Sequence, residues 1–172
     1  GKDINLTIDV RLQHALRREI MRSAKEFNAL GGAGIIMDVD TGEVLAGVSW
    51  PDFDPNEIDK ARDEDKFSRL TLGTYELGSV FKIFSTAAFL ENYDVPMSTT
   101  FDASEPIKRG RFVINDYHAE DRILTIPEVF MYSSNIGSAM IGDAVGTEKL
   151  RSFYADLGLL DPVDTEIPEL GK

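Results

Sequence analysis

The 172-residue sequence contains no cysteine and only two histidines, His14 and His118. The absence of cysteine excludes disulfides, thiolate catalysis and cysteine-based zinc sites. The two histidines are widely separated in the sequence and lie in different contexts, so a histidine-rich metal site is not expected either. We therefore expect no metal site in this chain.

Positive charge and long apolar runs are also scarce. There are 18 lysines and arginines against 30 aspartates and glutamates, which gives a formal net charge of −12. This charge would repel phosphate groups, which argues against binding nucleic acid or anionic lipid through a basic face. No apolar run approaches the roughly 18 to 20 residues that span a bilayer, and no signal peptide opens the chain. With 42% apolar residues, the sequence suits one globular domain with a real core.

Hydrophobic periodicity predicts the elements near the N-terminus. Residues 4–10 alternate apolar and polar as a short strand does, and Asp9 is a candidate N-cap for an amphipathic helix over residues 12–27. Residues 33–39 and 43–50 predict the two strands of a β-hairpin. Because the first of these runs is almost continuously apolar, we expect a central strand that is packed on both faces.

Caps and turn residues predict the later elements. These are a charged surface loop or loose helix at 57–66, a strand at 111–114, a helix opened by the capping box of Thr125 and Glu128, an apolar helix closed by Gly146, a helix over 148–157, and a loop at 161–172.

A polar motif opens the most apolar helix of the chain, in the run Leu77-Gly78-Ser79-Val80-Phe81-Lys82. The glycine allows a sharp turn, and Lys82 lies three residues after Ser79 on the same helix face. Burial in an apolar helix would depress the lysine pKa, as a general base requires, and the helix start offers N–H donors to an oxyanion. We interpret Ser79 as an acyl-accepting nucleophile and Lys82 as its base. Taken alone, the motif also fits a helix-capping serine beside a solvated or ion-paired lysine.

A second polar cluster, Ser133-Ser134-Asn135, lies between two predicted helices. It supplies a hydroxyl for proton relay and an amide that can bind a carbonyl or the lysine. With Ser79-x-x-Lys82 it resembles the serine acyl-transferases of the penicillin-binding protein and β-lactamase superfamily. Further stretches resemble the class B, monofunctional penicillin-binding proteins in order and spacing: Leu6-Thr7-Ile8-Asp9, Thr41-Gly42-Glu43-Val44-Leu45-Ala46, Pro51-Asp52-Phe53-Asp54-Pro55-Asn56, Asp116-Tyr117-His118, and Ser133 to Gly137.

This resemblance implies an α+β fold, an antiparallel sheet with helices, and a D,D-transpeptidase that cross-links peptidoglycan stem peptides. Ser79 would attack the penultimate carbonyl of a donor ending in D-Ala-D-Ala, and β-lactams would acylate the same serine. Lys82 would take the serine proton, Ser133 would relay a proton toward the amine, and Asn135 would orient Lys82 and bind the donor amide. Substrate binding thus falls to Ser79 and Asn135, and no metal or organic cofactor is implied.

The same resemblance implies partners and a location. Stem peptides and β-lactam antibiotics would be the ligands, and a cell-wall glycosyltransferase and other cell-wall machinery would be partners by analogy. The parent protein would be anchored in the inner, cytoplasmic membrane with this domain on the periplasmic side. Whether it serves division or elongation stays open.

The sequence departs from the family pattern at three places. Leu77 stands where proline is frequent, and Tyr132 where lysine or glutamine is common. The family's Lys-Thr/Ser-Gly motif is absent, since Lys108-Arg109-Gly110 has the wrong middle residue and precedes Ser133. We therefore expect residues 1–172 to be the N-terminal portion of a single transpeptidase domain that lacks the closing strands.

Such a piece should be inactive or weakly acylated alone, because a sheet without its edge strands exposes unpaired backbone. Two alternatives remain. One is a β-lactamase or β-lactam sensor of the same superfamily. The other is a non-catalytic cell-wall scaffold, which would have no need of either polar motif.

Overall fold

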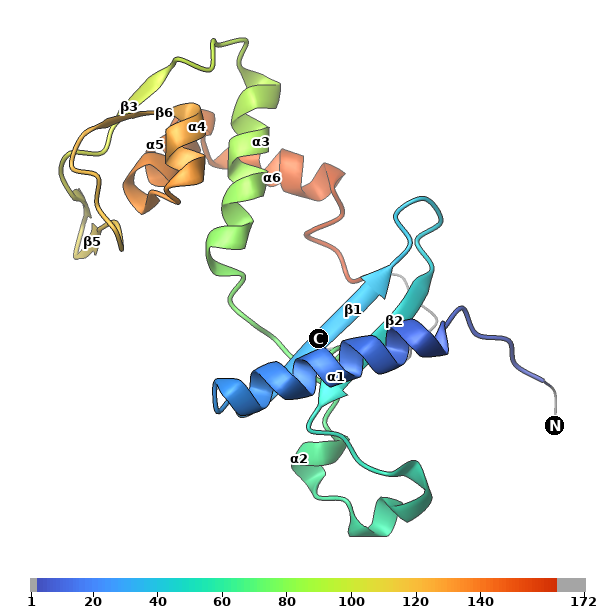
Figure 1. Cartoon of the computed structure of the whole chain (residues 1–172). Coiled ribbons are helices and arrows are strands. Elements are labelled where there is room, and N and C mark those ends of the chain that lie inside the picture. The colour runs from blue at the N-terminus through green and yellow to red at the C-terminus, as the bar shows by residue number, and fades with distance from the viewer. Residues whose placement is uncertain (1–2, 164–172) are drawn as a thin grey trace. The chain divides into compact units, whose positions relative to one another are not determined.

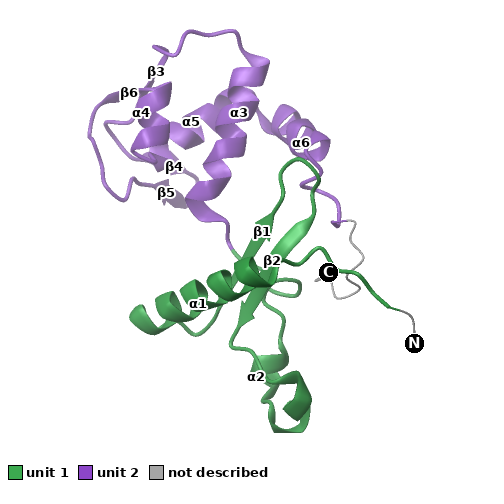
Figure 2. Cartoon of the chain, turned by 45° about the vertical axis from the view of Figure 1, so that its right-hand side comes forward, with its two compact units in different colours: residues 1–75, 165–172 green, residues 76–164 purple. Residues whose placement is uncertain are grey.

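The computed structural model describes residues 3–163, so most of the loop expected at 161–172 lies outside the described residues (Figure 1). The chain divides into two compact units, and their described parts are residues 3–75 and residues 76–163 (Figure 2). Each unit combines helices with antiparallel strands.

The first unit packs helix α1 (Val10–Glu26) against the hairpin of β1 (Gly32–Met37) and β2 (Val44–Trp50). Asp9 caps α1 as predicted, because its carboxylate accepts a hydrogen bond from the backbone N–H of Arg11 at 2.8 Å. The Gln13 side chain bonds both backbone groups of Gly47, at 2.7 and 2.9 Å, and so ties α1 to β2. The predicted helix and hairpin are both confirmed.

Two predictions for this unit are wrong. Residues 4–9 form no strand, because the segment meets β2 through the 2.9 Å bond from Asp9 N to Leu45 O and a side-chain bond of Thr7 rather than through a ladder. Strand β1 is not packed on both faces among the described residues. Its residues alternate in burial, and Ile35 and Met37 are each 50% exposed, since α1 covers one face and β2 is its partner.

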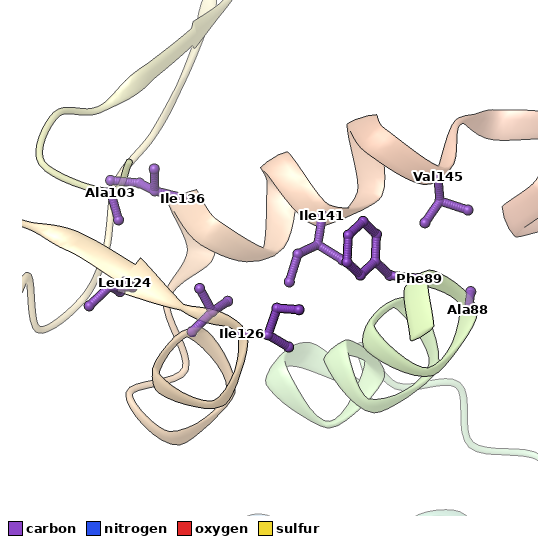
Figure 3. Close-up of a cluster of buried hydrophobic side chains, with 9 residues drawn as sticks. Ala88, Phe89, Ala103, Leu124, Ile126, Ile136, Ile141 and Val145 are labelled. Carbon is purple, nitrogen blue, oxygen red and sulfur yellow. The ribbon is translucent and has the colours of Figure 1, made fainter. Parts of the chain in front are cut away.

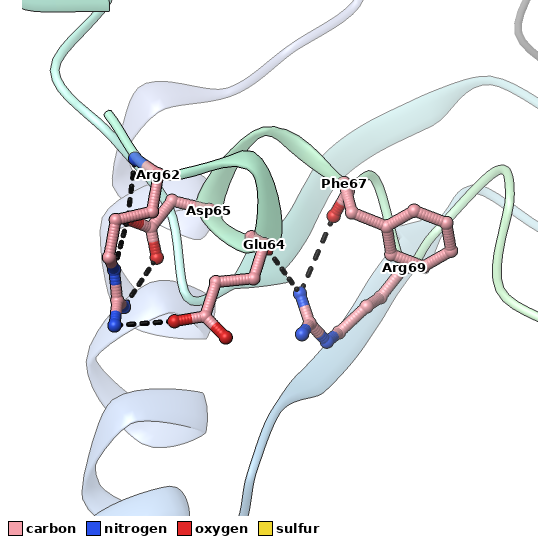
Figure 4. Close-up of polar contacts among 5 residues, drawn as sticks. All are labelled: Arg62, Glu64, Asp65, Phe67 and Arg69. Atoms are coloured by element: carbon pink, nitrogen blue, oxygen red, sulfur yellow. Dashed lines mark hydrogen bonds and ion pairs between the residues drawn. The ribbon is translucent and has the colours of Figure 1, made fainter. Parts of the chain in front are cut away.

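The charged segment after the hairpin forms two short helices, η1 (Pro55–Lys60) and α2 (Asp63–Lys66), which agrees with the predicted loose helix. The Arg62 guanidinium binds Asp65 at 2.7 and 2.9 Å and pairs with Glu64 (Figure 4). Hydrogen bonds from Arg62 hold the pKa of Asp65 below its ordinary value. Arg69 donates to the carbonyl of Glu64 at 3.2 Å and lies over the ring of Phe67. Side-chain pairing therefore orders this segment locally.

The second unit contains helices and two small antiparallel strand pairs. Its elements are η2 (Gly78–Phe81), α3 (Lys82–Asn92), β3 (Thr100–Asp102) paired with β6 (Ile123–Thr125), β4 (Ile107–Arg109) paired with β5 (Phe112–Ile114), α4 (Ile126–Met131), α5 (Asn135–Val145) and α6 (Thr147–Asp156).

Helices α3 and α5 pack against each other around one apolar cluster (Figure 3). Phe89 of α3 lies with Ile141 and Val145 of α5 in this cluster, which also takes Leu124 from β6. The cluster fixes the mutual position of the two helices whose first residues include Lys82 and Asn135. Helix α3 is less buried than predicted, since Val80 and Ile83 beside its start are 62% and 49% exposed.

Helix α4 begins with the predicted capping box. The Glu128 carboxylate accepts hydrogen bonds from the backbone N–H and the hydroxyl of Thr125, both at 2.8 Å, and from Arg122 at 3.0 Å. These bonds, the backbone one first, lower the pKa of Glu128 to about 2.

The cap should make stability depend on pH. Since the folded pKa of Glu128 is lowered from 4.5 to about 2, its stabilisation is complete above pH 4.5 and is lost as the pH falls toward 2. Urea unfolding of the wild type and of Glu128→Gln at several pH values should show a wild-type advantage at pH 7 that shrinks through this window. An advantage that stays constant over the window would contradict the assignment.

Gly137 in α5 has no room for a side chain. A Cβ there would lie 2.5 Å from Cγ2 and 2.9 Å from Cγ1 of Val129, whereas at Gly142 the nearest contact is Leu150 at 3.9 Å. We expect Gly137→Ala to lower the free energy of unfolding by about 1–3 kcal/mol through overpacking. Gly142→Ala in the same helix is the matched control and should raise it by about 0.5–1 kcal/mol through helix propensity. Urea titration followed by circular dichroism measures both, and equal effects would contradict the packing argument.

Candidate active site

Ser79 lies in the single 3₁₀ turn η2, directly before α3. Gly78 precedes it with φ of 56°, a left-handed conformation that favours glycine. The backbone N–H of Lys82 donates to the carbonyl of Ser79. Because side chains three residues apart eclipse in a 3₁₀ turn, this geometry places Ser79 and Lys82 on the same face. The Ser79 residue is exposed to solvent.

Lys82 contacts the turn between α4 and α5. Its Nζ donates to the backbone carbonyl of Ser133 at 2.6 Å, to Ser133 Oγ at 3.1 Å and to Asn135 Oδ1 at 2.6 Å. The structure thus brings together Lys82, Ser133 and Asn135, three of the four residues singled out from sequence. The fourth, Ser79, lies one turn before Lys82.

Burial lowers the pKa of the Lys82 ammonium from its ordinary value, while the negative charge of Asp116 raises it and so opposes part of that shift. The acceptors of Lys82 are a carbonyl, a hydroxyl and an amide oxygen, which are all neutral. An amine in this setting loses its proton more readily than a solvated lysine does.

The turn before α5 places Ser133 by an unusual backbone conformation. Ser133 has φ of 53°, and its N–H donates to the carbonyl of Phe130 at 3.1 Å. A residue other than glycine adopts this left-handed conformation at a cost of about 1 kcal/mol. The conformation redirects the chain from α4 into α5, and both the carbonyl and the hydroxyl of Ser133 reach Lys82.

Sequence reasoning gave no role to the segment Asn115-Asp116. The carbonyl of Asn115 accepts a hydrogen bond from Nδ2 of Asn135 at 2.8 Å, and the Asp116 carboxylate accepts from Ser134 Oγ at 2.7 Å. No spacing rule signals these contacts, because the segment meets the start of α5 only through the tertiary fold. Within residues 3–163, no group of three or more His, Asp or Glu side chains is placed to hold a metal ion.

Comparison with known proteins identifies the family. Residues 32–170 match the family model of the penicillin binding protein transpeptidase domain. The chain belongs to this family. It is 42% identical over 172 residues to the probable peptidoglycan D,D-transpeptidase FtsI of Caulobacter vibrioides. The aligned region covers 100% of this chain and 29% of that relative. It is 31% identical over 159 residues to the probable peptidoglycan D,D-transpeptidase PenA of Neisseria flavescens. That aligned region covers 92% of this chain and 39% of the PenA sequence.

Solved structures confirm the predicted fold. The transpeptidase domain of penicillin-binding protein 3 from Burkholderia pseudomallei superposes with a TM-score of 0.81 at 25% identity, covering 99% of this chain and 47% of that one. The penicillin G acyl-enzyme complex of penicillin-binding protein A from M. tuberculosis gives a TM-score of 0.83 at 24% identity, covering 94% and 41%. The class B resemblance and the α+β transpeptidase fold are therefore confirmed. The chain spans less than half the length of these relatives, and no helix within its described residues is long and apolar enough to span a membrane.

Lys82 should titrate at lower pH than an ordinary lysine, for which the pKa is about 10.4. Burial lowers the pKa of Lys82 by more than the charge of Asp116 raises it, and the acceptors of its hydrogen bonds are neutral. The measurement is ¹³C NMR of the lysine Cε signals as a function of pH, with Lys82→Arg to assign the signal that disappears. Titration of Lys82 at or above the ordinary value would contradict the geometry.

Proposed function

We propose that this chain contributes the nucleophile and the proton-transfer groups of a peptidoglycan D,D-transpeptidase. The observation that carries the proposal is the contact of Lys82 Nζ with Ser133 and Asn135, one turn after Ser79. The names of the FtsI and PenA relatives support the same activity.

The hydrogen bonds suggest how Lys82 can act as a base. A neutral amine has two N–H donors and one lone pair. The carbonyl of Ser133 and Oδ1 of Asn135 can only accept, so they would use the two donors. The lone pair is then free for a hydroxyl, either of Ser79 or of Ser133, whose Oγ makes the longest of these contacts at 3.1 Å. Ser133 can therefore reverse the direction of its bond, as a proton relay requires.

In the proposed reaction, Ser79 Oγ bonds to the penultimate carbonyl carbon of a D-Ala-D-Ala stem, and its proton passes to Lys82. Ser133 then gives its hydroxyl proton to the departing nitrogen and takes the proton held by Lys82, and the C–N bond to the terminal D-Ala breaks. An amine of a neighbouring stem attacks the carbonyl carbon of the resulting ester and loses a proton to Lys82. The ester C–O bond breaks as this proton passes to Ser79 Oγ, which forms the cross-linking amide and restores Ser79. Asn135 would hold the donor amide, and a β-lactam would acylate the same serine.

We further propose that residues 1–172 form the N-terminal portion of a single transpeptidase domain. The share of the relatives that is covered and the missing Lys-Thr/Ser-Gly motif support this. By resemblance, the parent protein would be anchored in the inner membrane with this domain on the periplasmic side, and would work with a cell-wall glycosyltransferase.

Intact-protein mass spectrometry after incubation with benzylpenicillin tests the proposal. The full-length protein should gain one drug mass, Ser79→Ala should gain none, and Ser152→Ala, which removes an exposed serine of α6, should behave as wild type. Residues 1–172 alone should react slowly or not at all. An unmodified full-length protein would overturn the proposal in favour of a scaffold, and an adduct that forms and then disappears would indicate a β-lactamase.

A further inference from the structure

Asp116 follows β5 and reaches the first turn of α5. Its Oδ2 accepts from Ser134 Oγ at 2.7 Å, and its Oδ1 accepts from the backbone N–H of Ile136 at 2.9 Å and from that of Asn135. A helix start has unpaired N–H groups and partial positive charge, and a carboxylate satisfies both. Asp116 is therefore bound to the beginning of α5 from a segment about 20 residues earlier.

Ser134 completes the capping of α5. Its hydroxyl donates to Asp116 and accepts from the N–H of Gly137 at 2.8 Å, and Ser134 is only 2% exposed. With the N–H of Ser138 bonded to the carbonyl of Ser134, each N–H of the first turn has an acceptor. The position of Asn135 at the head of α5 is fixed by these bonds and not by helix packing alone.

The same segment fixes which end of the Asn135 amide faces Lys82. Nδ2 of Asn135 donates to the carbonyl of Asn115 at 2.8 Å, and Oδ1 accepts from Lys82 at 2.6 Å. A flipped amide would set its oxygen against the Asn115 carbonyl and its NH₂ group against the ammonium. Both contacts would then be lost, so residues 115 and 116 fix the orientation as well as the place of Asn135.

We propose that Asp116 is a positioning residue for the acyl-transfer reaction, clamping the start of α5 so that Ser133 and Asn135 are held against Lys82. The inference rests on the proposed function of this site. Asp116 acts through Ser134 and the α5 backbone and has no direct contact with Lys82 among its hydrogen bonds.

Asp116 is also the charged side chain that acts electrostatically on Lys82 within the described residues. Other titratable groups on α3 and on the helices packed against it are engaged or exposed. Glu128 binds Thr125, Asp143 pairs with Arg109, Lys149 lies over the ring of Tyr93 and Tyr154 packs against Phe81, while Glu91, Glu148, Arg151 and Asp156 are exposed. A change of charge at position 116 can therefore be followed at Lys82.

The test measures the rate constant of acylation of the full-length protein by a fluorescent penicillin across pH. Asp116→Asn keeps the shape of the side chain but removes its charge, and it should slow acylation about ten- to a hundredfold at neutral pH, since small misplacements of reacting groups have effects of this size. Because the Asp116 charge raises the pKa of Lys82, the rising limb of the pH profile should also move to lower pH. A variant that is merely less stable would lose amplitude with its midpoint unchanged.

Two further variants separate position from charge. Ser134→Ala removes one contact of the clamp but keeps the carboxylate, so acylation should slow while the midpoint of the pH profile stays in place. Asp143→Asn makes the same charge change on α5 itself, at an exposed pair with Arg109, and should match wild type. Circular dichroism establishes that each variant is folded.

The two proposals can fail separately. If Ser79 is acylated but Asp116→Asn and Ser134→Ala react at the wild-type rate with the wild-type pH profile, the positioning role is overturned and the transpeptidase site stands. If wild type is not acylated, the proposed function is overturned, and the ¹³C signal of Lys82 Cε tests the clamp by itself. Because loosening the start of α5 displaces the acceptors of Lys82, this signal should shift in both Asp116→Asn and Ser134→Ala but not in Asp143→Asn, and an unchanged signal in the first two would overturn the inference.

Discussion

The second unit depends on one contact, between the ammonium of Lys82 and the start of α5. A partly buried cation that lost its acceptors would be costly, so the contact adds to the apolar cluster in fixing α5 relative to α3. Phe89, Ile141 and Val145 pack between the two helices, and Lys82 joins the first turn of α3 to the start of α5 by hydrogen bonds. The apolar cluster and the hydrogen bonds of Lys82 thus both join α3 to α5.

Both ends of α5 are held by specific groups, which keeps the contact from loosening. At its start, Asp116 and Ser134 satisfy the free N–H groups, and at its end Gly146 adopts φ of 81° as the chain turns into α6. Tyr93 adds a bond from its hydroxyl to the carbonyl of Ala144 at 2.6 Å. A helix restrained at both ends presents its first residue, Asn135, in one place.

The structural features that depend on residues close together in the sequence could be predicted. The cap at Asp9, the capping box of Thr125 and Glu128 and the stop at Gly146 each involve residues within one turn, and all were found. The strand expected at residues 4–10 was not, since a strand needs a partner that alternation does not supply. The sequence placed Asp116 in a stretch that resembles the family but predicted no role for it, because its partners lie 18 to 20 residues away. The motifs located Ser79, Lys82, Ser133 and Asn135, while tertiary contacts decided what holds them.

The distribution of charge around Lys82 stabilises the start of α5 and still allows Lys82 to lose its proton. A carboxylate bonded directly to the ammonium would stabilise the turn before α5 but would also keep the lysine protonated, which defeats a base. Here the direct acceptors are neutral, so burial can lower the pKa of Lys82. The carboxylate of Asp116 binds instead to the N–H groups of α5, where its charge is favourable to the helix and reaches Lys82 only in part. Because the negative charge binds the α5 backbone and not the ammonium, the helix start is stabilised while Lys82 can still lose its proton, as the proposed acyl transfer requires.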